Sequence, residues 1–362
     1  MKHIAICTPE ISYGDAVSND VLGMLNTLDK QNLEVCIFAE NIFVSDRTIK
    51  SIDCISNFIK DSEDVIIYHL STGWYKGLDV LTSLNCKKII KYHNITPPDY
   101  FYGFSQDHVE TCKVGIEQLS IIANLDLEMY LSDSRFNMMG IISKGAKASK
   151  CFVVPPFNNI ERLRNTRPDF GILNKYNDKK VNILSVGRVA PNKGFAELID
   201  VFALYHRFFN KESRLIIAGN RNPWLSAYIC YLEDRVRSLN LEDSIIFTDK
   251  INDEQLKSYY LVSRVFVLTS HHEGFCLPLI EAMSMKIPVI AYGSAAVPET
   301  VGNGGIIWED LDINVIATTM NEIVTSKDAY FFLGEAGWRE YRNNFTNKIV
   351  KEKFLSLIGK YL

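Results

Sequence analysis

Apolar residues fall into short runs that alternate with segments of helical period along most of the chain. Short continuous runs are typical of parallel strands buried on both faces, and a 3.6-residue period indicates helices. The runs are HIAIC, EVCIFAE, DVIIYHL, KKIIKYHN, MYLSDS and CFVVPP, followed by VNILSVG, RLIIAG, SIIFTD, RVFVLTS, PVIAYG and GIIW. Helices are predicted near 18–30, 48–60, 106–125, 135–144, 195–209, 224–238, 253–261, 278–285 and 347–360, with a short one between DVIIYHL and KKIIKYHN.

This alternation predicts an α/β protein whose sheets are parallel and covered by helices on both faces. A polar, irregular stretch over 155–180 separates two series of strands. We therefore expect two doubly wound, Rossmann-like domains with a cleft between them, the first over 1–157 and the second over 158–340. Ligands of such sheets bind beyond the carboxyl ends of the strands, so the loops that follow strands are the places to search for chemistry.

Composition narrows the class of protein. The chain has 362 residues, is 47% hydrophobic and carries a net charge of -4, so it lacks the basic excess of proteins that wrap nucleic acid. No apolar run reaches the roughly 20 residues that span a bilayer, and MKHIAICTPE predicts a first strand rather than a signal peptide. The eight cysteines are scattered without paired spacing, which argues against zinc and against a disulfide framework and fits a reducing cytoplasm.

The segment LTSHHEGFCLPLIEAMSM, 268–285, carries the strongest functional signal. It follows a buried strand, Gly274 permits a tight turn, and Pro278 suits the first position of a helix. The preceding Cys276 and Leu277 are poor helix caps. The helix is therefore expected to begin with unsatisfied N–H groups, which form a site for an anion such as a diphosphate.

Two carboxylates flank this helix start. Glu273 precedes the turn, and Glu281 is expected on the first helical turn. A carboxylate is well matched to the vicinal hydroxyls of a sugar or a ribose, so the ligand-binding segment is predicted to include Glu273, Gly274, Phe275, Cys276, Leu277 and Glu281. The alternative for Glu281 is a solvated side chain favoured by the helix dipole, which leaves Glu273 and the bare helix start unexplained.

A second loop, SVGRVAPNKGF over 185–195, joins another strand to a helix. Gly187 turns the chain, and Arg188 and Lys193 flank the loop. Two cations at the carboxyl end of a sheet can neutralise a diphosphate leaving group, with Arg gripping it bidentately and Lys acting as a point charge. The alternative is a pair of exposed loop cations.

GRVAPNKG, EGFCLPLIEAM and PVIAYGSAAVPETVG, in this order, resemble the family-4 retaining glycosyltransferases with the GT-B fold. The resemblance covers nearly all of the second half of the chain. It implies that Glu273 contacts the donor sugar, that Glu281 contacts the nucleotide ribose, and that Arg188 and Lys193 bind the diphosphate. It also implies that the final helix, at about 341–362, packs back on the first domain.

The resemblance further implies front-face displacement with retention at the anomeric carbon, in which the departing diphosphate helps to deprotonate the acceptor. No cofactor and no metal ion is expected. Cys276 stands where Gly is more usual, and its small side chain should still let the backbone approach the ligand. The D-x-D sequence over 310–312 follows GIIW and is expected to be a turn before a helix rather than a metal site.

The first half carries weaker signals. SYGDAVSNDVLGML, 12–25, resembles the family's glycine loop, in which Gly14 would permit close approach to the donor phosphates and acceptor. Asp15 is a candidate polar contact on the acceptor side, and Ser18 or Asn19 is the expected cap of the following helix.

Two histidines end predicted strands of this half. His93, in KYHNITPP, is similar to a family histidine that faces the transferred sugar, and we count it with Glu273, Arg188 and Lys193 as a catalytic candidate. His69, in IIYHLSTG, is a candidate acceptor contact. The alternative for each is a histidine that satisfies a strand end through a backbone hydrogen bond.

A basic segment spans 144–180, where nine Lys or Arg residues oppose three acidic residues. The default interpretation is a solvated linker. The alternative is weak docking on anionic lipid, which would suit a lipid-linked sugar acceptor, although the segment is too interrupted to form one amphipathic helix.

GDAVSND and YHNITPP are similar to segments of bacterial enzymes that build surface polysaccharides such as lipopolysaccharide, often with GDP-mannose. This similarity predicts a mannosyltransferase, either cytoplasmic or peripheral at the inner membrane face, that acts on a saccharide or a polyprenyl-linked saccharide. A UDP-hexose donor is the next alternative. Two other classes stay open: a nucleotide-sugar 2-epimerase of similar fold, and a non-catalytic subunit that binds a sugar nucleotide.

Overall fold

The structure is a computed structural model that describes residues 2–29 and 33–362. The chain forms two compact units, each made of segments that are distant in sequence. The first unit comprises Met1–Pro98, Asp107–Asn159 and Thr346–Leu362, and the second comprises Asp99–Gln106 and Ile160–Phe345. The short segment 99–106 therefore belongs to the second unit, although it lies within the first domain in sequence.

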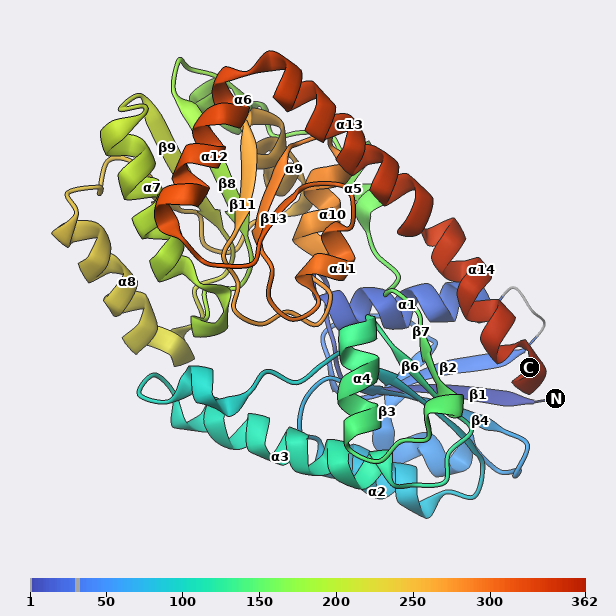
Figure 1. Cartoon of the computed structure of the whole chain (residues 1–362). Helices are drawn as coiled ribbons and strands as arrows, with labels where there is room; N and C mark the ends of the chain where they lie inside the picture. Colours follow the sequence, from blue (N-terminus) through green and yellow to red (C-terminus); the bar gives the residue numbers. More distant parts are fainter. Residues whose placement is uncertain (1, 30–32) are drawn as a thin grey trace. The chain divides into compact units, whose positions relative to one another are not determined.

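A seven-stranded sheet of order β3-β2-β1-β4-β5-β6-β7 forms the centre of the first unit (Figure 1). All its strand pairs are parallel. Its strands are β1 (His3–Ile11), β2 (Glu34–Ile42), β3 (Ile49–Ser51), β4 (Val65–Leu70), β5 (Lys87–Tyr92), β6 (Met129–Ser132) and β7 (Cys151–Val153). Every residue of β4 is buried, as expected for a central strand covered on both faces.

Helices cover both faces of this sheet. They are α1 (Ala16–Leu28), α2 (Tyr75–Ser83), α3 (Gln106–Ala123), α4 (Arg135–Ser143) and α14 (Asn347–Ile358), with 3-10 turns η2 (Ile52–Asn57), η3 (Pro98–Phe101), η4 (Ala148–Lys150) and η7 (Gly359–Tyr361). The last helix, α14, buries Val350, Phe354 and Ile358 in one core with β1 and α1. Apolar packing therefore holds the C-terminal segment on the first unit.

The second unit is built on a six-stranded sheet of order β10-β9-β8-β11-β12-β13, again with parallel pairs. Its strands are β8 (Val181–Val186), β9 (Ser213–Ala218), β10 (Ile245–Phe247), β11 (Val265–Leu268), β12 (Val289–Tyr292) and β13 (Ile306–Trp308). Its helices are α5 (Ile160–Asn165), α6 (Phe170–Tyr176), α7 (Phe195–Phe208), α8 (Ser226–Ser238), α9 (Asp253–Val262), α10 (Leu277–Ser284), α11 (Val297–Val301), α12 (Ile313–Thr325) and α13 (Lys327–Asn344), with 3-10 turns η5 (Pro191–Lys193) and η6 (Pro223–Leu225).

The predicted α/β fold class with two doubly wound parallel sheets is confirmed. In each sheet the strand order reverses at one point, between β1 and β4 in the first unit and between β8 and β11 in the second. Ligands of open α/β sheets bind at such switch points, beyond the carboxyl ends of the strands. The loops after β1, β4, β8 and β11 carry the residues singled out from the sequence.

Two predicted segments were wrong. The helix expected over 48–60 is the edge strand β3 followed by the 3-10 turn η2. The basic segment over 144–180 is not a solvated linker, because α5 and α6 lie in it and bury Ile160, Leu163 and Tyr176 in the core of the second unit. Periodicity failed in both cases because six or seven residues are too few to show it.

Helix α1 begins at Ala16, two residues before the predicted start, and its predicted end at residue 30 lies outside the described residues. The D-x-D sequence is a helix start, as predicted, since Asp312 caps α12 by accepting from the N–H groups of Asn314 and Val315. Among the helices described, none combines the length and the apolar character needed to cross a bilayer.

Candidate functional site

Two loops meet at the switch point of the second sheet. One loop follows β8 and leads through η5 into α7, and the other follows β11 and leads into α10. The backbone N–H of His271 donates to the carbonyl of Asn192 at 2.9 Å, and the Asn192 side chain donates to the carbonyl of His272 at 3.2 Å. These hydrogen bonds hold the loops of the two predicted motifs side by side.

Gly194 lets the two loops approach closely. It caps α7 with φ of 63°, and a Cβ at this position would lie 2.1 Å from the backbone oxygen of Thr269. The Thr269 hydroxyl donates to the carbonyl of Gly194 at 2.7 Å. A side chain at position 194 would therefore push apart the loops that carry Lys193 and Glu273.

Lys193 and Glu273 form an ion pair at this junction. The ammonium nitrogen of Lys193 lies 2.8 and 2.9 Å from the two carboxylate oxygens of Glu273. The Glu273 side chain is only 7% exposed and that of Lys193 is 17% exposed. Arg188 lies in the same loop as Lys193, and its side chain is exposed. The structure thus brings one shielded cation, one shielded carboxylate and one exposed guanidinium to the carboxyl edge of this sheet.

The start of α10 has the predicted bare end. Cys276 occupies the cap position and no side chain caps the helix, while Pro278 supplies no N–H group. Cys276 has φ of 78°, a left-handed conformation that residues other than Gly rarely adopt. This backbone requirement explains why Gly would be the usual residue at this position, and it marks strain next to the site.

Glu281 lies on the second turn of α10 rather than on the predicted first turn, because the helix begins at Leu277. The hydroxyl of Tyr260, on α9, donates to its carboxylate at 2.7 Å. Burial raises the pKa of Glu281 to about 7, despite the opposing effect of the Tyr260 hydrogen bond. Glu281 therefore holds a proton more readily than an ordinary glutamate.

The loop after β1 in the first unit contains Gly14 and Asp15. Gly14 is exposed, has φ of 83°, and leaves open space where a Cβ would point. Asp15, not Ser18 or Asn19, caps α1, since its carboxylate accepts from the backbone N–H of Ser18 at 2.8 Å. The predicted cap was wrong because Asp15 is three residues before Ser18, the spacing at which a cap side chain reaches a free N–H group.

Beneath this edge of the first sheet lies a cluster of five polar residues, namely Asp20 on α1, His69 on β4, Lys91 on β5, His93 just after β5 and Asp133 just after β6. His93 shares one hydrogen bond with His69, Nε2 to Nδ1 at 2.8 Å, and another with Asp133, Nδ1 to Oδ2 at 2.9 Å. The ammonium of Lys91 lies 2.5 Å from Oδ1 of Asp133.

The cluster is also tied to the segment that follows β7. The Lys91 ammonium donates to the carbonyl of Val154, and Asp20 accepts from the backbone N–H of Phe157 at 2.8 Å. The side chains of Asp20, His69 and Lys91 have no exposed surface. The burial of His69 argues against its predicted contact with an acceptor, because its ring bonds His93 and does not reach the surface.

Asp20, His69 and His93 place three ligand-type atoms within 4.8 Å of one another. However, the Lys91 ammonium lies 3.8 Å from the nearer Asp20 oxygen and already supplies a buried positive charge. Nδ1 of His69 and Nε2 of His93 are engaged with each other, and Nδ1 of His93 is engaged with Asp133. We therefore assign no metal ion to this group.

Several residues of these sites were missed from the sequence. Lys91 had a readable signal, because a lysine inside the apolar run KKIIKYHN must find a buried partner. Asp20, Asp133 and Tyr260 had none, since each becomes significant only through a contact with a residue distant in sequence.

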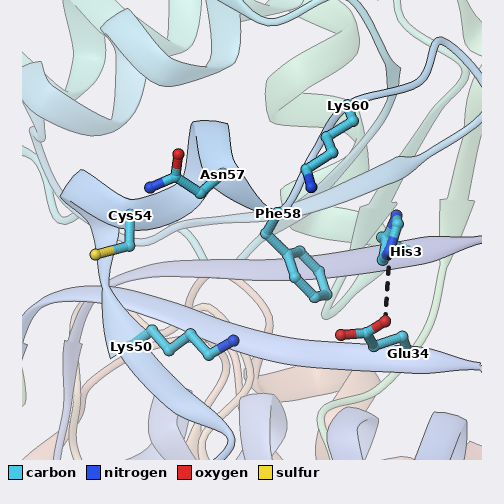
Figure 2. A pocket seen from close by; sticks show the side chains of 7 residues that line it. All are labelled: His3, Glu34, Lys50, Cys54, Asn57, Phe58 and Lys60. Atoms are coloured by element: carbon cyan, nitrogen blue, oxygen red, sulfur yellow. Dashed lines mark ion pairs between the residues drawn. The ribbon is translucent and has the colours of Figure 1, made fainter.

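A separate hollow of about 330 Å³ lies at the opposite, amino edge of the first sheet. Figure 2 shows its lining, with His3 pairing Glu34 beside Phe58. His3 also lies 3.1 Å from Asp64. Lys50 lies over the ring of Phe58. The hollow lies at the edge away from the strand ends that carry the candidate residues.

Residues 167–346 match the family model of the glycosyl transferases group 1. The matched residues include both loops of the second unit.

Three curated relatives each match about half of the chain or less. Mannosylfructose-phosphate synthase of Agrobacterium fabrum is 29% identical over 180 residues, 49% of this chain and 40% of the relative. O-antigen chain mannosyltransferase B of Escherichia coli is 31% identical over 134 residues, 37% of this chain and 34% of the relative. The capsular polysaccharide biosynthesis glycosyltransferase CapM of Staphylococcus aureus is 29% identical over 185 residues, 49% and 45% of the two chains. The match thus spans less than half the length of these relatives.

Solved structures resemble the whole chain. HepE of Anabaena in complex with UDP-glucose has a TM-score of 0.78 at 14% identity, with 99% of this chain and 100% of that chain covered. Sucrose-phosphate synthase of Thermosynechococcus elongatus has a TM-score of 0.76 at 16% identity, with 99% of each chain covered. At such identities the likeness concerns the fold, and it confirms the predicted GT-B class.

The raised pKa of Glu281 predicts a pH-dependent stability in the ligand-free protein. Between the ordinary pKa near 4.5 and the folded value of about 7, the folded state binds more protons than the unfolded state, so raising the pH lowers stability. Glu281→Gln removes the ionisable group. The melting temperature of the variant should equal that of the wild type near pH 4.5 and exceed it increasingly up to pH 7. A constant difference across this range would contradict the raised pKa.

Proposed function

We propose that this protein is a member of the glycosyl transferases group 1 that moves a hexose from a nucleotide-sugar donor to an acceptor hydroxyl, with retention at the anomeric carbon. The observation that supports it most directly is the junction of the second unit, where Lys193, Glu273 and Arg188 lie together at the carboxyl edge of a parallel sheet. Positive charge at a strand edge, beside an uncapped helix, suits a diphosphate.

Each part of the donor would bind a different set of these groups. Arg188 and Lys193 bind the diphosphate, with backbone groups of Gly187 and of residues 274–277 close to it. Glu273 accepts hydrogen bonds from hydroxyls of the sugar, and Glu281 accepts hydrogen bonds from hydroxyls of the ribose. Each carboxylate oxygen that already accepts one hydrogen bond keeps a lone pair for another. The family resemblance assigns Gly14 and His93 to the donor and Asp15 to the acceptor.

The reaction proposed is a front-face displacement. The bond from the anomeric carbon to the phosphate oxygen breaks, the bond to the acceptor oxygen forms on the same face, and the acceptor proton passes to the departing phosphate. Arg188 and Lys193 stabilise the charge that develops on the diphosphate, so positioning and electrostatics supply most of the catalysis. We propose that no metal ion takes part, because the two cations fill that role.

We further propose a mannosyl donor and a saccharide acceptor in surface polysaccharide synthesis. The support is the likeness to relatives named as an O-antigen chain mannosyltransferase and as a capsular polysaccharide glycosyltransferase. A UDP-linked hexose is the alternative donor, supported by the fold likeness to a structure that contains UDP-glucose.

A cytoplasmic location at the inner membrane face is also proposed. The basic segment 144–180 is not one surface, since Arg162 pairs with Asp253 and Arg164 stacks over Trp338 within the second unit.

Membrane contact is supported by α4 and the turn after it. Phe136 and Met139, on α4, are exposed at 41% and 55%. Two cations, Lys144 and Lys147, follow closely in the sequence.

Transfer activity tests the donor assignment. Lys193→Ala removes a cation from the diphosphate site, and should lower kcat by about 10²–10³-fold, measured as transfer of labelled mannose from GDP-mannose, or of glucose from UDP-glucose, to lipid-linked saccharide. Lys211→Ala, at an exposed position of the same unit, should keep normal turnover. Near-normal turnover of the Lys193 variant would remove Lys193 from the site.

All assays would be run in EDTA, which should leave activity unchanged. A loss of activity that Mn²⁺ restores would contradict the metal-free mechanism. If the protein consumed the donor without any acceptor as fast as it does with one, an epimerase would be favoured. If it bound the donor without turning it over, a non-catalytic subunit would be favoured.

Sedimentation with vesicles tests the membrane contact. The wild type should bind phosphatidylglycerol vesicles at low salt and release them as salt increases, because screening weakens surface attraction. Lys144→Glu combined with Lys147→Glu should abolish binding. Equal binding of this double variant, or equal binding to neutral phosphatidylcholine vesicles, would contradict the assignment.

A further inference from the structure

Both ring nitrogens of His93 face protein groups. Nδ1 lies 2.9 Å from Asp133, and Nε2 lies 2.8 Å from His69. The side chain of His93 is only 6% exposed, whereas the residue as a whole is half-buried, so its exposed surface is mostly main chain. The ring therefore anchors this residue at the edge of the sheet.

We propose that Asp133 is a positioning residue that sets the tautomer and orientation of the His93 ring, with Lys91 as its counter-ion and His69 as the second contact of the ring. The consequence for catalysis rests on the proposed function, because His93 is taken to border the donor sugar. The proposal itself concerns groups of the first unit alone.

The hydrogen bonds select one tautomer. An ionised Asp133 can only accept, so Nδ1 of His93 carries the proton of that bond. If Nε2 of His93 also carried a proton, it would donate to Nδ1 of His69, and neutral His69 would hold its proton on Nε2. That Nε2 is buried and has no partner among the described residues, and a buried N–H without an acceptor is costly. The pair is instead satisfied when Nδ1 of His69 donates to Nε2 of His93.

The charges of the cluster agree with this arrangement. Burial opposes ionisation of Asp133, but the facing groups of His93 and Lys91 prevail and hold its pKa below the ordinary value. Burial raises the pKa of Asp20 and lowers the pKa of His69 well below its ordinary range. Asp133 is thus the carboxylate of the cluster that favours ionisation, and Lys91 lies 2.5 Å from it as its counter-ion.

The residue after His93 shows what the anchor holds in place. Asn94 has φ of 76°, a left-handed conformation, and its side chain accepts from the backbone N–H of Ile95 at 2.9 Å. The backbone N–H of His93 donates to the carbonyl of Leu70 at 2.9 Å. A strained backbone persists only where its surroundings fix it. Here it is fixed by the buried His93 ring and by Ile95, which packs in the core of the first unit. Loosening the ring therefore removes one of the two anchors of the edge segment over 93–95.

Nitrogen NMR of histidine tests the tautomer in the full chain. With ¹⁵N-labelled histidine, the His93 signals are those absent from His93→Gln. In the wild type, the ¹⁵N chemical shift of His93 Nδ1 should be that of a protonated ring nitrogen, and that of Nε2 should be that of an unprotonated one. Asp133→Asn, whose amide can donate to Nδ1, should reverse this pattern. Asp126→Asn, at an acid that is 85% exposed just before β6, is the matched control and should leave it unchanged.

Turnover tests the positioning role. Asp133→Asn should lower kcat by about 10²-fold, as expected for a misplacement of about 1 Å, with a much smaller change in KM. Asp133→Glu, which keeps the acceptor and the charge, should recover part of the loss. A reversed tautomer with unchanged kcat would overturn the positioning role, as would equal losses for Asp133→Asn and Asp126→Asn.

The wild-type spectrum alone decides the tautomer if Asp133→Asn does not fold. Protonation of Nε2 of His93 in the wild type would overturn the proposal, and so would Zn²⁺ binding in a 1:1 ratio that shifts the signals of His69 and His93. Nucleotide binding measured on the same samples separates this question from the proposed function. An absence of nucleotide binding would refute the donor site and leave the His93 spectra still decisive.

Discussion

A parallel strand covered on both faces leaves little room for charged side chains except near its ends. Nearly every candidate residue of this protein obeys that constraint. The loops after β8 and β11 carry Lys193 and Glu273, and the loop after β1 carries Gly14. Because both sheets reverse their strand order beside these same strands, the polar groups converge at one place in each unit.

Each unit compensates its buried charge locally. In the second unit, Lys193 and Glu273 pair with each other when no ligand is present, and Gly194 keeps their loops close enough to do so. In the first unit, Lys91 and Asp133 form the ion pair, and His93 is bound to it through Asp133. Breaking either pair leaves one buried charge without a partner, typically at a cost of about 3–5 kcal/mol. Ion pairs within each unit therefore hold the charged side chains of both groups in place.

The sequence predicted the fold class and most strands, because buried parallel strands leave continuous apolar runs. It also predicted the bare start of α10, which depends only on local residues such as Cys276 and Pro278. It failed where elements are short, as at α5 and α6, and where a residue acts through a distant partner. Tyr260 and Asp133 belong to the second kind, since nothing in their own neighbourhoods indicates Glu281 or His93 as a partner.

The conformation of Cys276 shows a different limit of prediction from the sequence. Its unusual identity was visible in the sequence, but the left-handed backbone that makes it unusual was not. A thiol at this position is tolerated at the cost of strain beside the predicted ligand-binding segment.

The most direct test of the account is the melting temperature of the protein with GDP, UDP, ADP and their sugars, each in EDTA. A ligand that binds only the folded state raises the melting temperature with its concentration. The account predicts a clear rise with one nucleotide family, GDP first and UDP next, and loss of that rise in Lys193→Ala. No rise with any nucleotide, in protein that melts cooperatively, would contradict the claim that the second unit binds a nucleotide sugar.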